Sequence, residues 1–129
     1  MADTPYVRKG IYEDTLNVAD HSLTARLLNN QAAQDFASML PLTLNVNDLF
    51  RREKFGHLPR ALSIDGKRTH SYEIGQLIYW SPGPDLAIFY RHDGETIPDP
   101  GIIVIGNLDS GVEALQVPGA VTIGFELLQ

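Results

Sequence analysis

Short runs in which apolar and polar residues alternate occur along much of the chain, and glycines and prolines separate them. In residues 22–28, Leu23, Ala25 and Leu27 alternate with polar neighbours, which is the period of a strand with one buried face. The same alternation occurs in residues 42–47 and 121–127. Residues 76–80, 86–90 and 102–105 are short apolar runs between turn signals, which also favours strands.

One segment has the period of a helix. Ala32, Phe36 and Leu40 recur four residues apart and form one apolar stripe, and Asn29-Asn30 before them supplies an N-cap. Pro41 ends this helix, because the residue before a proline avoids the helical region. A strand over residues 42–47 is expected to follow directly.

Two connections complete the pattern. Residues 61–64 and 69–72 flank Asp65-Gly66, a dipeptide typical of a tight hairpin turn, so a β-hairpin is predicted there. Residues 48–60 show no clean period and are interpreted as an irregular connection. Seven or eight strands and one helix result, which predicts a mainly β fold, either a sandwich or a closed barrel.

Composition narrows the classes of function. With 129 residues the chain forms one domain, and with no cysteine it has neither a disulfide framework nor a thiolate metal site. Ten Lys and Arg against sixteen Asp and Glu give a net charge of −6, the wrong sign for a nucleic-acid or anionic-membrane partner. The chain contains no apolar run of membrane-spanning length and no secretory signal, so a cytoplasmic location is expected.

A search for catalytic and cofactor motifs finds little. The chain lacks G-x-S-x-G, a P-loop and a strand-linked GxGxxG, so no cofactor is predicted. The cluster His92-Asp93-Gly94-Glu95 has metal-ligand residue types, but its spacing matches no established motif and also describes a solvated turn, so no metal site is predicted. The run Arg51-Arg52-Glu53-Lys54 is interpreted as a solvated face, although its arginines could also hold a carboxylate or phosphate.

Specific segments resemble a known family. They are Glu73-Ile74-Gly75-Gln76, Tyr79-Trp80-Ser81-Pro82-Gly83, Leu86-Ala87-Ile88-Phe89-Tyr90 and Ile103-Val104-Ile105-Gly106-Asn107-Leu108 with Gly111. Together with the capped helix and strand in residues 28–48, they resemble the small bacterial and archaeal cyclophilin-like family over residues 22–127. The resemblance implies a closed β-barrel of about eight strands with one α-helix, and a short helical turn at Glu113-Ala114-Leu115. We predict a barrel domain over residues 16–129, preceded by an extension, residues 1–15, that is either a pairing strand or flexible.

The resemblance is weaker at the catalytic pattern of true cyclophilins. Their phenylalanine-histidine-arginine strand has no counterpart here, and Ile88 precedes the pair Phe89-Tyr90 where they carry a glutamine. Strong isomerase activity is therefore not expected.

Two hypotheses for function follow from the resemblance and the aromatic residues. The first is a binding module in which Tyr79, Trp80, Phe89 and Tyr90 line a groove for a peptide or small apolar ligand. The alternative is a peptidyl-prolyl cis-trans isomerase with a rearranged site, in which Arg60 or Arg91 is the cationic donor. Packing in the barrel core is the competing interpretation of the aromatic side chains. The sequence makes no prediction about oligomeric state.

Overall fold

The computed structural model describes residues 13–127, which form eight strands, one α-helix and one 3-10 turn. In chain order these are β1 (Glu13–Val18), β2 (His21–Leu27), α2 (Gln31–Ala37), β3 (Leu42–Leu49), β4 (Glu53–His57), β5 (Gln76–Trp80), β6 (Asp85–Phe89), β7 (Ile103–Leu108), the 3-10 turn η1 (Val112–Leu115) and β8 (Val121–Leu127). The predicted mainly β class with one helix and a short helical turn is confirmed.

The strands form a closed barrel in the order β1-β2-β7-β5-β6-β4-β3-β8, and every neighbouring pair is antiparallel. Closure leaves no free strand edge among these eight strands. β1 pairs with both β2 and β8 and begins at Glu13, inside the predicted extension of residues 1–15. Residues 1–12 lie outside the described part of the chain.

Alternation fills the barrel interior with one large apolar core. In β2 the residues Leu23, Ala25 and Leu27 are buried, as the sequence pattern predicts. Helix α2 packs on the same core, where Phe36 meets Phe125 of β8 edge to face at a centroid distance of 5.5 Å. The predicted N-cap is confirmed, because the side-chain oxygen of Asn30 accepts a 2.8 Å hydrogen bond from the main chain of the third helical residue.

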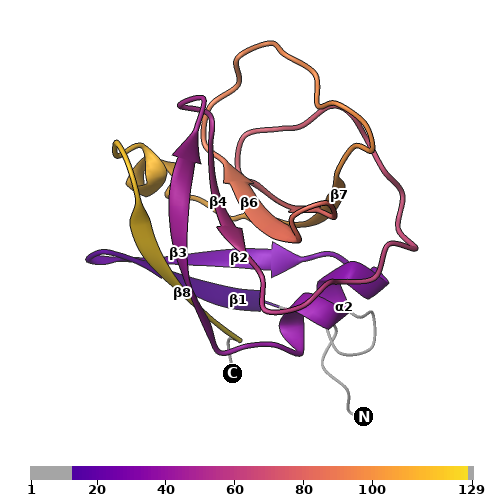
Figure 1. The fold of residues 1–129 in the computed structure, drawn as a ribbon. Helices are drawn as coiled ribbons and strands as arrows, with labels where there is room; N and C mark the ends of the chain where they lie inside the picture. Colours follow the sequence, from indigo (N-terminus) through magenta and orange to yellow (C-terminus); the bar gives the residue numbers. More distant parts are fainter. Residues whose placement is uncertain (1–12, 128–129) are drawn as a thin grey trace.

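A second, smaller apolar cluster lies on the outside of the barrel. β5 and β6 bury residues on both faces, and their outward side chains pack with Tyr72, Ile97 and Ile102. The two long connections, residues 58–75 and 90–102, both run around this side of the barrel (Figure 1). Tyr72, Ile97 and Ile102 of these connections cover the outward side chains of β5 and β6. Within residues 13–127, no helix is both long and apolar enough to cross a membrane.

The hairpin prediction around Asp65-Gly66 is wrong. Residues 61–72 form no strand, and the backbone of Gly66 does not take the positive φ that a tight hairpin turn needs. Instead Thr69 exchanges two 2.9 Å main-chain hydrogen bonds with Ile102, which lies just before β7. A long-range partner thus replaces the local one.

The prediction that residues 48–60 are irregular is wrong for residues 48–57 and holds for residues 58–60. β3 ends at Leu49 and β4 starts at Glu53. Between them, Phe50 and Arg51 form a tight turn. The charged residues hide the strand pattern in the sequence, because two of them are buried within β4 instead of facing water.

Candidate functional site

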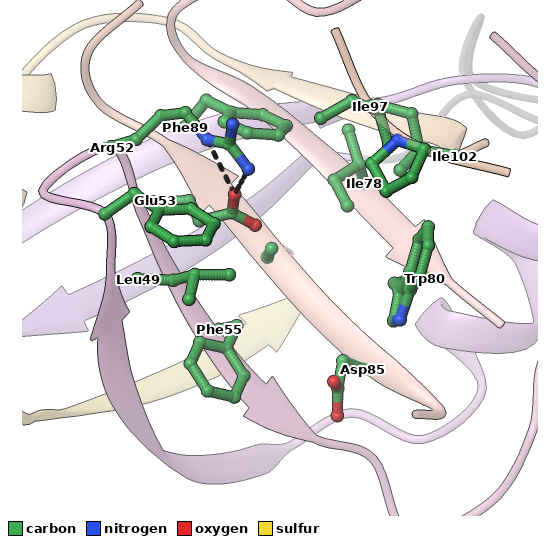
Figure 2. Close-up of a pocket in the computed structure, with 13 residues that line it drawn as sticks. Leu49, Arg52, Glu53, Phe55, Ile78, Trp80, Asp85, Phe89, Ile97 and Ile102 are labelled. Atoms are coloured by element: carbon green, nitrogen blue, oxygen red, sulfur yellow. Dashed lines mark hydrogen bonds and ion pairs between the residues drawn. The ribbon is translucent and has the colours of Figure 1, made fainter. Parts of the chain in front are cut away.

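A cavity of about 210 Å³ lies on the outer face of the barrel, over β4, β6 and β5 (Figure 2). Successive side chains of a strand point to opposite faces, so Ala87 and Phe89 of β6 and Ile78 and Trp80 of β5 point outward into it. We call this cavity the outer pocket. Its lining consists of Leu49, Phe50, Arg52, Glu53, Phe55, Ile78, Trp80, Asp85, Ala87, Phe89, Ile97, Pro98 and Ile102.

The segment after β6 forms one wall of the outer pocket through Ile97 and Pro98. The main chain of Ile97 donates a 2.8 Å hydrogen bond to the carbonyl of His70. Tyr72 stacks on Phe89 at a centroid distance of 4.0 Å, and its other face stacks on His92 at 4.2 Å. The aromatic stack therefore links β6, the segment after it and the connection before β5, and it stabilises this wall of the outer pocket.

A buried ion pair forms the polar end of the outer pocket. The Nε atom of Arg52 donates a 2.9 Å hydrogen bond to Oε2 of Glu53, Nη2 donates to the same oxygen, and each residue is only 6% exposed. Nη1 of Arg52 lies 3.5 Å from Asp93. The guanidinium also lies 5.2 Å from the ring centroid of Phe50 and 5.4 Å from that of Phe89, within cation–π range.

This geometry leaves one acceptor beside an apolar cavity. Both dashed lines in Figure 2 end on one oxygen of Glu53, and the other oxygen faces the pocket. Within residues 13–127 this second oxygen accepts no hydrogen bond. Burial raises the pKa of Glu53, against the lowering effect of its contacts with Arg52. The hydrogen bond and charge of Glu53 raise the pKa of Arg52 although burial opposes them, so the guanidinium stays charged.

The structure separates the four aromatic residues proposed as ligand-binding. Trp80 and Phe89 line the outer pocket, whereas Tyr79 and Tyr90 point into the barrel. The hydroxyl of Tyr79 accepts a 3.1 Å hydrogen bond from the main chain of Leu62. Strand alternation is the reason, because adjacent residues face opposite sides.

Neither arginine proposed as a cationic donor lines the outer pocket. Arg60 donates a 3.0 Å hydrogen bond to Ser38 beside the helix, and Nε of Arg91 donates a 2.7 Å bond to the carbonyl of Arg51. The cation at the pocket is Arg52, which the interpretation of a solvated face missed. That interpretation holds for the exposed Arg51 and is wrong for Arg52 and Lys54, which are 6% and 0% exposed.

The cluster at residues 92–95 forms a turn. Asp93 accepts 2.8 Å and 3.0 Å hydrogen bonds from the hydroxyl of Tyr72 and the main chain of Glu95, and Nδ1 of His92 accepts from Gly94. In the described part of the chain no three His, Asp or Glu side chains are grouped as metal ligands would be. Asp93 instead links the turn to Tyr72 and Arg52.

A continuous apolar run was the signal that could have located the outer pocket. β5 and β6 contain apolar residues at consecutive positions, whereas β2, β3 and β8 alternate. A strand that is apolar on both faces needs a second layer outside the barrel. No comparable local signal marks Arg52, since its pairing with the adjacent Glu53 is also typical of a surface, and its other partners, Asp93 and Tyr72, are distant in sequence.

Comparisons with known proteins agree with this architecture. The solution structure of a hypothetical protein from Archaeoglobus fulgidus matches this chain with a TM-score of 0.75 over 99% of this chain and 100% of its own. Its sequence identity is 18%, so this likeness shows the fold alone. No curated protein sequence matches the chain. The sequence profile of the cyclophilin-like family matches residues 16–126, most of the barrel, and the chain therefore belongs to the cyclophilin-like family.

Proposed function

We propose that the protein is a binding module whose outer pocket receives one small apolar group of a peptide or small-molecule ligand. The observation that carries this proposal is a mostly apolar cavity of about 210 Å³ with a polar end. An apolar cavity of about 150 Å³ is large enough for one benzene-sized ring. The size therefore suits a single ring or branched side chain, such as that of a proline or leucine.

The polar end favours a ligand that carries an N–H group near its apolar group. The oxygen of Glu53 that faces the pocket is a charged acceptor in a site largely removed from water, where hydrogen bonds to charge are strong. A peptide supplies such an N–H from its main chain. Arg52 is already bonded to Glu53, so it contributes mainly to the charge balance of the site.

The single tryptophan of the chain, Trp80, provides the assay, because it lines the outer pocket. Titration of a proline-containing peptide library should change Trp80 fluorescence in a saturable way. Amide shift changes in a ¹H–¹⁵N spectrum should be concentrated in β5, β6 and the segment after β6. Peptides that saturate neither signal at millimolar concentration would contradict the proposal.

Filling the outer pocket should abolish binding. Ala87 is buried and lines the cavity, so Ala87→Leu places three additional carbons in the space that the ligand would occupy. We expect affinity for a responsive ligand to fall at least about tenfold, about 1.4 kcal/mol. Isothermal titration calorimetry measures the affinity, and urea unfolding checks that the variant remains folded.

Ala61→Leu is the matched control, because Ala61 is exposed and does not line the pocket. The same residue change there should leave affinity unchanged. Equal affinity of the wild-type protein and Ala87→Leu would place the ligand elsewhere on the barrel.

The position of Arg52 favours a second candidate function, isomerisation of X-Pro bonds. Uncatalysed rotation has a barrier near 20 kcal/mol, and a cation beside a pocket that holds the proline could stabilise the twisted amide. Arg52 meets the positional requirement, whereas Arg60 and Arg91 do not line the pocket. Its bonds to Glu53 limit the donors available, so we expect little turnover.

Exchange spectroscopy on an Ala-Pro peptide with substoichiometric protein tests this candidate. Cis–trans exchange peaks that persist in Arg60→Ala and Arg91→Ala but vanish in Arg52→Gln would identify an isomerase that uses Arg52. Peaks that vanish in Arg60→Ala or Arg91→Ala would instead identify that arginine as the cationic donor. Absence of exchange with wild-type protein would exclude isomerisation of this peptide and leave the binding module.

A further inference from the structure

A second cavity, of about 500 Å³, lies at one end of the barrel and shares no lining residue with the outer pocket. We call it the rim cavity. Its lining comprises Asp48, Arg51, Tyr90, Arg91 and the segment 116–119 that follows η1. Lys54 fastens this segment, because its Nζ donates to the carbonyls of Val117 and Gly119 at 2.5 Å and 2.6 Å.

Positive charge dominates the rim cavity. Arg51 and Arg91 both line it, and neither side chain forms an ion pair within residues 13–127. Arg91 is held beside Arg51 by the 2.7 Å bond from its Nε to the main-chain carbonyl of Arg51. Within the described residues its two terminal nitrogens form no hydrogen bond or ion pair, so they remain as donors for a ligand. The whole chain has a net charge of −6, so this cationic site contrasts with the overall charge.

The one carboxylate of the rim cavity is already satisfied. Asp48 accepts hydrogen bonds from the hydroxyl of Tyr90 and from the main chain of Arg51, the latter at 2.9 Å, and lies 3.3 Å from Nζ of Lys54. Lys54 balances its charge, and the two arginine charges remain in excess.

The two arginines act on the same group in the cavity wall. Burial, followed by the hydrogen bond and the charge of Asp48, raises the pKa of Tyr90 to about 12, and the positive charges of Arg91 and Arg51 oppose this rise. The geometry agrees with this, because Arg51, Arg91 and Tyr90 all line the rim cavity.

The β3–β4 turn holds Arg51 in place at a conformational cost. Phe50 and Arg51 have φ values of 58° and 51°, in the left-handed region that glycine or asparagine usually occupies in such turns. The bond from the main chain of Arg51 to Asp48 fixes the turn. As a result, Phe50 lines the outer pocket and Arg51 lines the rim cavity.

We propose that the rim cavity binds a small organic anion, whose carboxylate or phosphate group is held by the guanidinium groups of Arg51 and Arg91. Planar guanidinium groups match both kinds of oxyanion through paired N–H donors. Val117 and Pro118 supply apolar wall for the rest of the ligand. The proposal for the rim cavity does not depend on ligand binding at the outer pocket.

Titration with sodium succinate and with inorganic phosphate tests the site, against sodium chloride at matched ionic strength. The Nε–Hε signals of Arg51 and Arg91 and the amide signals of residues 117 and 119 should shift in a saturable way with either probe. Succinate saturating at a lower concentration would favour carboxylates, and phosphate doing so would favour phosphates. Saturation by both with no response to chloride is expected.

Variants separate a specific site from general attraction. Arg51→Gln and Arg91→Gln should each weaken binding about five- to tenfold, whereas Arg51→Lys and Arg91→Lys, which keep the charge but lose the fork, should weaken it less. Arg60→Gln, which removes an exposed arginine outside the cavity, should leave affinity unchanged. Ala87→Leu should also leave it unchanged, since it alters only the outer pocket.

Linear shifts without saturation, or the same loss of affinity in Arg60→Gln as in Arg51→Gln, would overturn the proposal. The first result would indicate nonspecific ion association. The second would indicate that affinity follows net charge and not this cavity.

Discussion

Replacement of Lys54 by methionine is expected to lower the free energy of unfolding by about 3 kcal/mol, because removal of one partner of a buried polar network leaves the others unpaired. Lys54 is fully buried at one end of the barrel. It binds two main-chain carbonyls and lies beside Asp48. Methionine keeps most of the volume but supplies neither a donor nor a charge. Urea unfolding followed by far-ultraviolet circular dichroism measures the change.

Lys67→Met is the matched control, since Lys67 is exposed. Its free energy of unfolding should stay within about 0.5 kcal/mol of the wild-type value. A second variant that carries both Lys54→Met and Asp48→Asn should recover part of the loss, because it removes the carboxylate that Lys54→Met leaves without a cation.

The loss of unfolding free energy in Lys54→Met should also depend on pH. Hydrogen bonds from Tyr90 and Lys54 lower the pKa of Asp48 below its ordinary value of 3.8, although burial alone would raise it. A carboxyl group whose pKa is lower in the folded state stabilises the fold at pH values above its unfolded-state pKa. This stabilisation is lost as the pH falls through the folded-state pKa. The difference between wild type and Lys54→Met should therefore shrink below about pH 4. An equal loss at all pH values would show that Asp48 takes no part.

Local pattern was sufficient to predict most of the barrel. β8 coincides with the alternation over residues 121–127, and β5 coincides with the apolar run over residues 76–80. In these segments the residues that decide the structure are neighbours in sequence. The same holds for Asn30, whose side chain caps the helix that immediately follows. Such features need no distant partner to be recognised.

Burial of charge could not be predicted in this way. The partners of Lys54 at the barrel end are 63 and 65 residues away in sequence. In isolation, a run of two arginines, a glutamate and a lysine is typical of a solvated surface. Pairing of β4 with β6 brings Asp93 beside Arg52, and pairing of β3 with both β4 and β8 brings the segment 116–119 to Lys54. The sequence pattern therefore could not predict that Arg52 lies at the outer pocket or that Lys54 forms the network at the rim cavity.

The aromatic residues are an intermediate case. Their grouping in neighbouring strands was visible in the sequence, and alternation alone separates Tyr79 from Trp80 and Phe89 from Tyr90. The register of β5 against β6, where Tyr79 pairs with Leu86, places Trp80 on the same face as Phe89. The register thus defines two alternative sets of pocket residues, and packing of the barrel interior decides which set faces outward.

Phe89→Ala is expected to lower the free energy of unfolding by about 3 to 4 kcal/mol and to abolish ligand binding at the outer pocket. Phe89 is fully buried, and truncation of a buried phenylalanine removes apolar contacts and leaves a cavity. It also removes the ring on which Tyr72 stacks and a ring that faces the guanidinium of Arg52. Chemical denaturation measures the first effect, and Trp80 fluorescence titration measures the second.

The effect should extend beyond the site of the substitution, because the Phe89–Tyr72–His92 stack supports the segment after β6. In Phe89→Ala, amide hydrogen exchange at Ile97, which donates to the carbonyl of His70, should become faster than in the wild type. Exchange in β1 and β8, on the other half of the barrel, should change only as much as global stability does. Uniform acceleration throughout the chain would show that the outer cluster does not open separately from the barrel.

Phe50→Ala is the matched control, since Phe50 lines the same pocket but is 68% exposed. It contributes a cation–π contact with Arg52, which is worth about 0.5 to 1 kcal/mol at an exposed position. We therefore expect a loss of at most about 1 kcal/mol and no change in the exchange rate at Ile97. If both phenylalanine variants lost the same stability, burial on the outer face would not be what stabilises this side of the barrel. The outer apolar cluster would then contribute little to the free energy of unfolding, and the outer pocket would lack the rigid wall that selective binding needs.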